Sequence, residues 1–213
     1  MTKDVVIAHY QERVSSWVHL LPEANVIVYT KGKPEKFQPH PKVNEVIPLP
    51  NVGRESHTYL THIVKNYPHF PAVTLFLQGN PRRHGYKFNF EKYFSIELGK
   101  CSSVMKLASR VSTKLYANFD KGLEHKARWK KTERSSYSFV EWWREHISVS
   151  IPSTNTFKVS WGACFSVTSE YILAHPIEYY QKLLASVSYS VDPEEGHFME
   201  RAWFTIFYDS TNE

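Results

Sequence analysis

Cysteine and glycine are both scarce in this sequence. Its 213 residues include two cysteines, Cys101 and Cys164, and eight glycines. Two widely separated cysteines provide neither the close spacing of a metal site nor a disulfide framework, so we expect reduced, buried thiols in a cytosolic compartment. Few glycines together with twelve prolines predict well-defined turns and exclude a flexible glycine-rich linker.

Long hydrophobic runs are missing as well. The first four residues, Met1 to Asp4, are followed by an apolar run that is too short for a signal peptide or a membrane span. No later run reaches the length of a span. We therefore expect a soluble, cytoplasmic protein that has no membrane span.

The composition is that of one globular domain. Apolar residues make up 42% of the chain and charged residues 22%, which is ordinary for a folded protein. The net charge of +5 and the pI near 9.0 favour an anionic ligand. Because the basic residues are scattered among acidic ones and no nucleic-acid-binding motif is visible, a nucleic-acid binder is the weakest of the alternatives.

Strand and helix patterns alternate at the amino end. Residues 4–10 and 25–30 have the pattern of buried strands. The apolar residues between them recur at helical spacing, at Val14, Trp17, Val18 and Leu21. Strand, helix and strand at this spacing open a doubly wound sheet. We therefore predict a single α/β domain over residues 1–213, with a central, mostly parallel mixed sheet of about six strands flanked by helices.

A candidate ligand-binding edge follows the most apolar strand pattern. Residues 73–77 are rich in β-branched and aromatic side chains, which is typical of a strand buried on both faces. The run ends in Gln78-Gly79-Asn80, which places polar groups at the carboxyl end of the strand. Ligands of open α/β sheets bind at that edge. The alternative is a core strand followed by an ordinary turn.

A loop that ends in Gly53 leads directly into a helical pattern. The first turn of such a helix has free backbone N–H groups and the positive end of the helix dipole. Arg54 adds a side-chain cation beside them. The segment is therefore a candidate phosphate site, and the alternative is a plain helix start with a surface arginine.

The middle of the chain is harder to interpret. We predict helices at Val104–Ala117 and at 138–146, and we interpret the charged residues 121–134 as a solvated segment. Two adjacent tryptophans lie in the second helix. Such a pair is usually part of a core and sometimes a platform for a sugar ring.

Two later features place small or acidic residues at the ends of predicted elements. Gly162 and Ala163 interrupt a strand-like region over residues 156–167 and would let a ligand approach the backbone closely. Glu194 and Glu195 precede the last helical pattern. Carboxylates at a helix start are also favoured by the helix dipole, which is the alternative to a catalytic role.

Taken in order, these features resemble nucleotide-sugar glycosyltransferases of the GT-A fold. In that fold a strand ends in Asp-X-Asp, a Gly-Ala turn lies beside the acceptor, and an acidic pair opens a helix with a later arginine. The segment from Glu194 to Arg201 resembles this acidic helix start. Asn51-Val52-Gly53 resembles a helix-opening loop of the same enzymes.

Five motifs resemble one family more closely. They are AHYQE, LPNVGRESHTYLTHIV, FLQGNPRRH, WGACFSV and EEGHFMERAWFTIF, and together they cover nearly the whole chain. This DUF3431-like family comprises small GT-A-fold glycosyltransferases of fungi and large DNA viruses, among them a chlorella-virus domain thought to build capsid glycans. The resemblance implies a GT-A-like (Rossmann-like) enzyme that transfers a hexose or deoxyhexose from a UDP-sugar to a glycan or glycoprotein acceptor.

The resemblance also implies the site residues. The donor nucleotide and diphosphate would contact Ala8, His9, Tyr10, Thr30, Arg54, Gln78, Gly79 and Asn80, with His84 as a further candidate. The acceptor side would comprise Trp161, Gly162, Ala163 and His197. Glu195 would act as general base if the reaction inverts the anomeric configuration, with Glu194 as the alternate.

A divalent cation, Mn²⁺ or Mg²⁺, would bind at Asn80 and Gln78. The chain departs from the GT-A pattern here, because amides replace the two aspartates of Asp-X-Asp. Amide oxygens can ligate a hard cation but bring no negative charge. Either the donor diphosphate supplies most of that charge, or Arg54 and nearby bases replace the metal. The main alternative function is a module that binds a nucleotide sugar or glycan without turnover.

Overall fold

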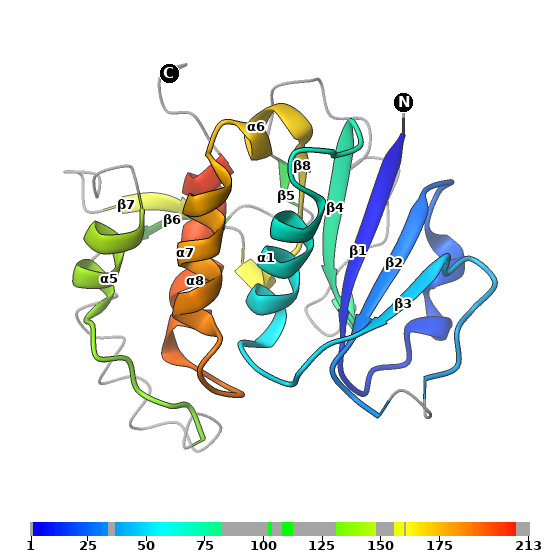
Figure 1. Cartoon of the computed structure of the whole chain (residues 1–213), viewed down its shortest axis with the longest axis horizontal. Coiled ribbons are helices and arrows are strands. Elements are labelled where there is room, and N and C mark those ends of the chain that lie inside the picture. The colour runs from blue at the N-terminus through cyan, green and yellow to red at the C-terminus, as the bar shows by residue number, and fades with distance from the viewer. Residues whose placement is uncertain are drawn as a thin grey trace.

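The protein is a mixed α/β domain built on a six-stranded sheet (Figure 1). The computed structural model describes residues 2–33, 37–81, 102–103, 108–112, 131–147, 156–159 and 161–207. The strands of this sheet, in spatial order, are β3 (Glu45–Pro48), β2 (Asn25–Thr30), β1 (Lys3–His9), β4 (Val73–Gln78), β8 (Phe165–Thr168) and β5 (Ser102–Ser103). Strands β1 to β4 are parallel, and β8 pairs antiparallel with both β4 and β5. The predicted α/β class and the mostly parallel mixed sheet are confirmed.

Helices and a small second sheet complete the described part of the chain. The α-helices are α1 (Arg54–Asn66), α5 (Phe139–His146), α6 (Ser169–Leu173), α7 (Ile177–Val187) and α8 (Glu194–Phe207). The short 3₁₀ segments are η1 (Val14–Ser16), η2 (Val18–Leu20) and η6 (Trp161–Ala163). Strands β6 (Ala108–Ser112) and β7 (Thr156–Val159) form the antiparallel second sheet. Among the described residues, no helix is long and apolar enough to cross a membrane.

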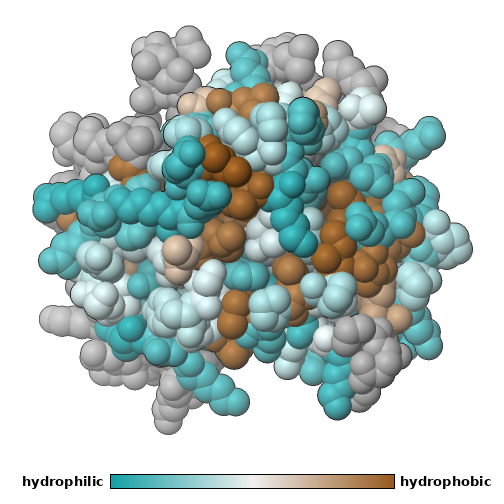
Figure 2. Space-filling view, viewed as in Figure 1, coloured by the Kyte–Doolittle hydropathy of each residue, from teal (hydrophilic) through white to brown (hydrophobic). Residues whose placement is uncertain are grey.

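Two apolar cores lie on opposite faces of the main sheet. On one face, side chains such as Val6 and Phe76 pack against α1, α5, α7 and α8. On the other, Val5, Leu75 and their neighbours pack against the two 3₁₀ turns. Figure 1 shows α1 in front of the sheet with α7 beside α1, and Figure 2 shows that apolar atoms reach this surface in separate areas among hydrophilic ones. Both faces are therefore covered over the central strands, which explains their continuous apolar runs.

Two predicted helices are wrong. The pattern from Val14 to Leu21 forms two 3₁₀ turns, since Trp17 between them has φ −143° and leaves the helical conformation. Its indole N–H donates to the carbonyl of Gly79 at 3.0 Å, a tertiary contact that local spacing does not reveal. Within Val104–Ala117, residues 108–112 form strand β6, because they pair with β7, far along the sequence.

The predicted helix at 138–146 is confirmed, and its start explains why. Ser138 and Glu141 form a capping box, in which each side chain accepts a hydrogen bond from the other residue's backbone N–H. Both tryptophans of this helix, Trp142 and Trp143, are fully buried. They belong to the core, so they offer no platform for a sugar.

One edge of the sheet collects the polar ends of several elements. The register pairs His9 with Thr30 and Ala8 with Gln78, so β1, β2 and β4 end at the same level. In Figure 1 this is the lower edge, where α1 and α8 also begin. Strand ends and helix starts therefore meet there, as expected of a ligand-binding edge in an α/β sheet.

Candidate functional site

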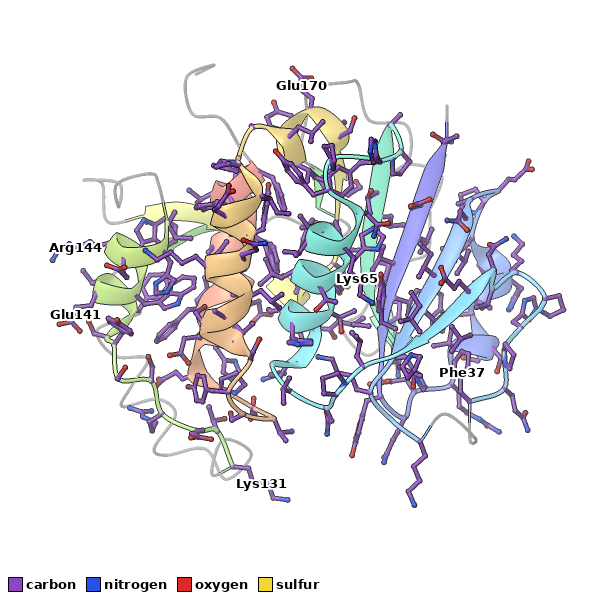
Figure 3. All side chains as sticks on the ribbon, in the orientation of Figure 1. Phe37, Lys65, Lys131, Glu141, Arg144 and Glu170 are labelled. Carbon is purple, nitrogen blue, oxygen red and sulfur yellow. The ribbon has the colours of Figure 1, made fainter. Side chains whose placement is uncertain are left out.

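A pocket of about 740 Å³ opens at the ends of β1 and β2. Its volume lies in the usual range for small-molecule sites. We call it the strand-end pocket; its lining residues are His9, Tyr10, Gln11, Glu12, Arg13, Val14, Ser15, Lys31, Gly32, Lys33, Phe37, Gln38 and Asn51. Figure 3 labels Phe37 at this lower edge of the molecule. The sequence-predicted residues His9 and Tyr10 thus line an open pocket.

His9 lines this pocket, and Thr30 holds its ring. The ring Nδ1 of His9 lies 2.9 Å from the hydroxyl of Thr30, and its Nε2 lies 3.1 Å from the carbonyl oxygen of Glu12. Burial lowers the pKa of His9, against the attraction of Glu12. Both ring nitrogens are therefore occupied, and His9 shapes the wall, whereas Tyr10 is 45% exposed and free to contact a ligand ring.

Glu12 is a carboxylate at this edge that the sequence analysis did not single out. One oxygen accepts hydrogen bonds from the backbone N–H groups of Tyr10 at 2.8 Å and Gln11 at 3.1 Å. A Cβ atom added to Gly79 would lie 2.6 Å from the same oxygen, so the two residues are in close contact. The carboxylate of Glu12 therefore lies directly against the polar turn that follows β4.

That turn contains the predicted cation ligands. Gln78 is half-buried and Asn80 is exposed, so both amides are accessible to a ligand. Among the described residues no group of three or more His, Cys, Asp or Glu side chains could hold a metal. The oxygens of the two amides and of the nearby Glu12 are of the type that a hard cation prefers. They are too few to bind the ion alone, so a bound ligand would have to supply further oxygens.

Lys31, which sequence reasoning also missed, connects the pocket to the start of α1. Its ammonium donates to the carbonyl oxygens of Val52 and Arg54. Burial lowers the pKa of Lys31 to about 7, against the attraction of Glu55. Burial and the nearby Lys31 lower the pKa of His57 to about 4, so His57 is neutral near pH 7.

The backbone at the start of α1 is left-handed at two successive residues, Gly53 with φ 61° and Arg54 with φ 48°. The N–H of Gly53 donates to the carbonyl of Ser190 at 2.8 Å. A Cβ atom at Gly53 would lie 2.3 Å from the carbonyl oxygen of Val187. Glycine is therefore required for the chain to turn into the helix against the end of α7.

The first turn of α1 has unused polar groups. Gly53 provides no side-chain cap, so the first N–H groups of the helix are available to an anion. The hydroxyl of Ser56 and Nδ1 of His57 are buried and have no hydrogen-bond partner in the part of the chain that the structure describes. This is the electrostatic environment in which phosphate groups bind.

Arg54 joins this helix start to the segment that leads into α8. Its Nη1 lies 3.3 Å from Oδ1 of Asp192 and 3.0 Å from Nε2 of His197. Its Nε lies 3.7 Å from Glu55. Burial alone would lower the pKa of Arg54, but Glu55 and Asp192 raise it, so the guanidinium stays charged. Arg54 and His197, predicted separately, are thus brought together.

The predicted acidic pair points elsewhere. Glu195 is 4% exposed and accepts hydrogen bonds from the hydroxyls of Ser135 at 2.6 Å and Tyr189 at 2.5 Å. Glu194 accepts from the backbone N–H of Ser135 at 3.0 Å and lies 3.4 Å from Arg134. Both carboxylates hold the segment before α5 against the start of α8. Their catalytic role stays a prediction.

A third carboxylate on α8, Glu200, faces the cluster around Arg54. One of its oxygens accepts the backbone N–H of Gly162 at 2.6 Å. Burial and Glu55 raise the pKa of Glu200, against the attraction of Arg201 and Arg54. Glu200 lies four residues after Gly196, which faces Arg54. Helical spacing therefore places Glu200 on the same face of α8 as Gly196, and this spacing is the signal in the sequence that could have identified it. We call Arg54, Glu55, Asp192, His197 and Glu200 the helix-end cluster.

The small-residue turn lies beside this cluster. Gly162 and Ala163 have φ of 75° and 48°, a left-handed pair within η6. The next residue, Cys164, is fully buried beside the backbone of Gln78, and burial raises the pKa of its thiol to about 12. The turn therefore connects the end of β4 to Glu200. The side chain of Trp161 and all of His84 lie outside the described residues.

The comparisons with known proteins give one family. The sequence model of the family described as "Protein of unknown function (DUF3431)" matches residues 5–213. No curated protein matches the chain. The match covers the strand-end pocket, the helix-end cluster and the turn between them.

Proposed function

The chain belongs to the DUF3431 family, and we propose that it is a glycosyltransferase that uses a UDP-sugar donor and a glycan or glycoprotein acceptor. One observation carries the proposal. The strand-end pocket and the helix-end cluster share the loop that Lys31 holds at Val52 and Arg54. We propose that the open pocket, the cationic helix start and the half-buried carboxylates of the cluster would hold the nucleoside, the diphosphate and the sugar of such a donor in turn.

The nucleoside would occupy the strand-end pocket. Tyr10 offers an exposed ring on which a base can stack, and Glu12 and Asn51 offer polar groups for the base or ribose. Ala8 and Thr30 would lie next to this ligand, since Ala8 precedes His9 in β1 and Thr30 is paired with His9 in β2. This assignment keeps the sequence-predicted nucleotide residues in one place.

The diphosphate would bind at the start of α1. Free N–H groups, the helix dipole and Arg54 all favour negative charge there, and Lys31 adds a nearby cation. As the bond between the sugar and the diphosphate breaks, negative charge grows on the leaving phosphate. Preoriented cations stabilise that charge, which is the largest contribution that such a site can make.

Gln78 and Asn80 would hold a Mn²⁺ or Mg²⁺ ion jointly with the donor's diphosphate oxygens, with Glu12 as the nearest carboxylate. When bound, the ion would neutralise charge on the leaving diphosphate. Arg54 stabilises the same group independently. Gly162, Ala163 and His197 would lie on the acceptor side, and Glu195 remains the proposed general base for an inverting reaction.

The proposal is tested first by ligand-induced thermal shifts. UDP, GDP, CMP and their sugars are each added with and without Mn²⁺, and we expect a selective rise in Tm with UDP and its sugars. Consumption of a UDP-sugar, by transfer or by slow hydrolysis, then separates an enzyme from a module that binds without turnover. Absence of any UDP-dependent shift would remove the proposal.

The resemblance extends the proposal to the biological setting. A viral origin, a role in capsid glycosylation and action in the host cytoplasm are proposed from the resemblance alone. Assaying glycan acceptors isolated from capsids against unrelated glycoproteins tests this setting. Equal transfer to both would contradict it.

A further inference from the structure

Glu12 contributes a carboxylate to the strand-end pocket. Of the described residues that line this pocket, only Glu12 is acidic, whereas Arg13, Lys31 and Lys33 are basic. None of these three cations forms an ion pair with Glu12 within the part of the chain that the structure describes. The carboxylate is half-buried, so it lacks both a cationic partner and full hydration. A hydrogen-bond donor on a ligand would stabilise it.

The orientation of this carboxylate is fixed by one of its oxygens. Oε2 accepts hydrogen bonds from the backbone N–H groups of Tyr10 at 2.8 Å and Gln11 at 3.1 Å. The same oxygen lies against the turn after β4, because a Cβ atom added to Gly79 would be 2.6 Å from it. Trp17 joins the loop to that turn, since its indole N–H donates to the carbonyl of Gly79 at 3.0 Å. The carboxylate is thus oriented before a ligand binds, and little side-chain entropy is lost on binding.

The second oxygen of Glu12, Oε1, remains available. Among the described residues no group donates a hydrogen bond to it, and it does not belong to the buried atoms that lack a partner. Since it is neither bonded nor buried, a ligand in the pocket can reach it. A carboxylate has about four acceptor positions, and the N–H groups of Tyr10 and Gln11 occupy positions on Oε2 alone. The positions on Oε1 suit one or two O–H donors.

The place of Glu12 along the sheet edge favours the ribose of a nucleotide. Glu12 lies where the pocket meets the Gly79 turn, which carries the proposed cation ligands for the diphosphate. Tyr10 and Phe37, whose rings suit a base, line the same pocket. In a nucleoside diphosphate the ribose lies between the base and the diphosphate, and its 2′ and 3′ hydroxyls are adjacent donors. A phosphate group suits this position poorly, because the carboxylate repels it.

We propose that Glu12 accepts hydrogen bonds from the ribose hydroxyls of the donor nucleotide and thereby selects ribonucleotide sugars over 2′-deoxyribonucleotide sugars. The inference rests on the proposed function, which places the nucleoside in the strand-end pocket. Carboxylates beside the strand ends of other nucleotide-binding α/β sheets accept the ribose 2′-hydroxyl for the same chemical reason. A 2′-deoxyribose removes that donor and leaves a half-buried, charged acceptor unsatisfied, which weakens binding.

The test compares the affinities of UDP and 2′-deoxy-UDP by isothermal titration. We expect the wild-type protein to bind UDP about tenfold more tightly, as a hydrogen bond to a charged group contributes. Glu12→Gln keeps the shape of the side chain and one oxygen that can accept the N–H groups of Tyr10 and Gln11, so the preference should fall to about twofold. The matched control is Glu170→Gln on α6, at the opposite edge of the molecule (Figure 3), which should leave the preference unchanged.

The outcomes separate the two proposals. If neither nucleotide binds, the proposed function fails and this inference fails with it. If the wild-type protein binds both nucleotides equally, only the ribose contact is overturned, and this comparison needs no substitution. If Glu12→Gln weakens both nucleotides but keeps the wild-type preference, Glu12 contacts another part of the ligand, such as the N–H of the uracil ring, and the inference is again overturned.

Titrations with and without Mn²⁺ supply a second readout, because Glu12 is also the carboxylate nearest to the proposed cation ligands. A direct ribose contact predicts the same preference for UDP over 2′-deoxy-UDP in both conditions. A role through the cation predicts that Glu12→Gln weakens the two nucleotides equally, and only when Mn²⁺ is present. That result would contradict the ribose contact and leave the proposed function standing.

Discussion

The strand-end pocket and the helix-end cluster lie along one edge of the sheet but are built differently. Most of the pocket comes from residues 9–15, 31–33, 37 and 38, which lie at or after the ends of two neighbouring strands. The cluster joins Arg54 and Glu55 to Asp192, His197 and Glu200, from the other end of the chain. The pocket is open and its walls are fixed by local hydrogen bonds. The cluster is dense in charge, and its charged groups pair with one another.

This difference separates recognition from charge control. A pocket made of adjacent strand ends can hold a flat, weakly charged group such as a base, because its walls need little long-range support. A cluster that stabilises a diphosphate has to hold cations in place before the ligand arrives. Here Asp192 and His197 hold Arg54, and the loop at Val52 and Gly53 joins the two regions.

Replacing Gly53 should disrupt the loop that joins the strand-end pocket to the helix-end cluster. Of the changes proposed here, we expect it to lower the stability of the protein the most. Gly53→Ala adds a Cβ atom 2.3 Å from the carbonyl oxygen of Val187, at a residue with φ 61°. We expect a loss of about 3 kcal/mol in the free energy of unfolding, measured by urea denaturation. Gly196→Ala is the control, since its nearest contact, 3.6 Å from Cδ of Arg54, is ordinary. Equal stability of the two variants would contradict the close packing at this loop.

Removing the guanidinium of Arg54 should disable the cluster and leave the pocket intact. Arg54→Ala should weaken UDP-glucose binding by about 100-fold, because a charge-assisted contact to phosphate is lost. Binding of uridine, which has no phosphate, should change little. Arg54→Lys should be intermediate, and Arg144→Ala on the exposed face of α5 is the control. A parallel loss of uridine binding would show that the two regions are not separable.

Glu195, in the first turn of α8, lies outside the helix-end cluster and tests whether a carboxylate near it is structural or catalytic. It accepts two hydroxyl hydrogen bonds in a buried position, so Glu195→Gln should lower the free energy of unfolding by about 2 kcal/mol. Thermal unfolding measures this, with the exposed Glu178→Gln of α7 as control. An unchanged Tm together with lost transfer and retained UDP binding would instead support the general-base role predicted from the sequence.

The smallest expected effect concerns Lys31, which touches both regions. Burial places its pKa at about 7, so it is charged below that pH and largely neutral above it. The affinity for UDP-glucose, whose pyrophosphate keeps its charge in this range, should therefore fall about threefold as the pH rises through 7. Lys31→Arg keeps its charge and should abolish the dependence. Titrations at several pH values measure this, and a wild-type affinity that rises with pH would contradict it.

Local pattern predicted those parts of the site that depend on nearby residues. The continuous apolar run of β4 indicated a strand covered on both faces, and its polar end indicated the ligand edge. The glycine before α1 indicated a helix start, and the capping pair Ser138 and Glu141 accounts for the start of α5. In each case hydrogen bonds and burial act over a few residues, so the pattern is visible in one stretch of sequence.

Long-range contacts explain the rest. Val14 to Leu21 has helical spacing, but the hydrogen bond from Trp17 to Gly79 holds it in 3₁₀ turns. Glu194 and Glu195 lie at a helix start, which is where the sequence predicts a catalytic acidic pair. In the structure, however, Ser135 donates a hydrogen bond to Glu194 and Tyr189 donates one to Glu195. No local pattern distinguishes a carboxylate that faces a cleft from one that holds a loop.

By itself, the sequence determined the α/β class, the parallel strands and the edge at which a ligand would bind, because alternating apolar patterns and turn residues act locally. Only the tertiary structure decided which charged groups meet at that edge: Arg54 with His197, and Glu200 with Glu55 and Gly162. Such meetings depend on how distant helices pack and on which charges remain buried together, and neither is encoded in any single stretch of the chain.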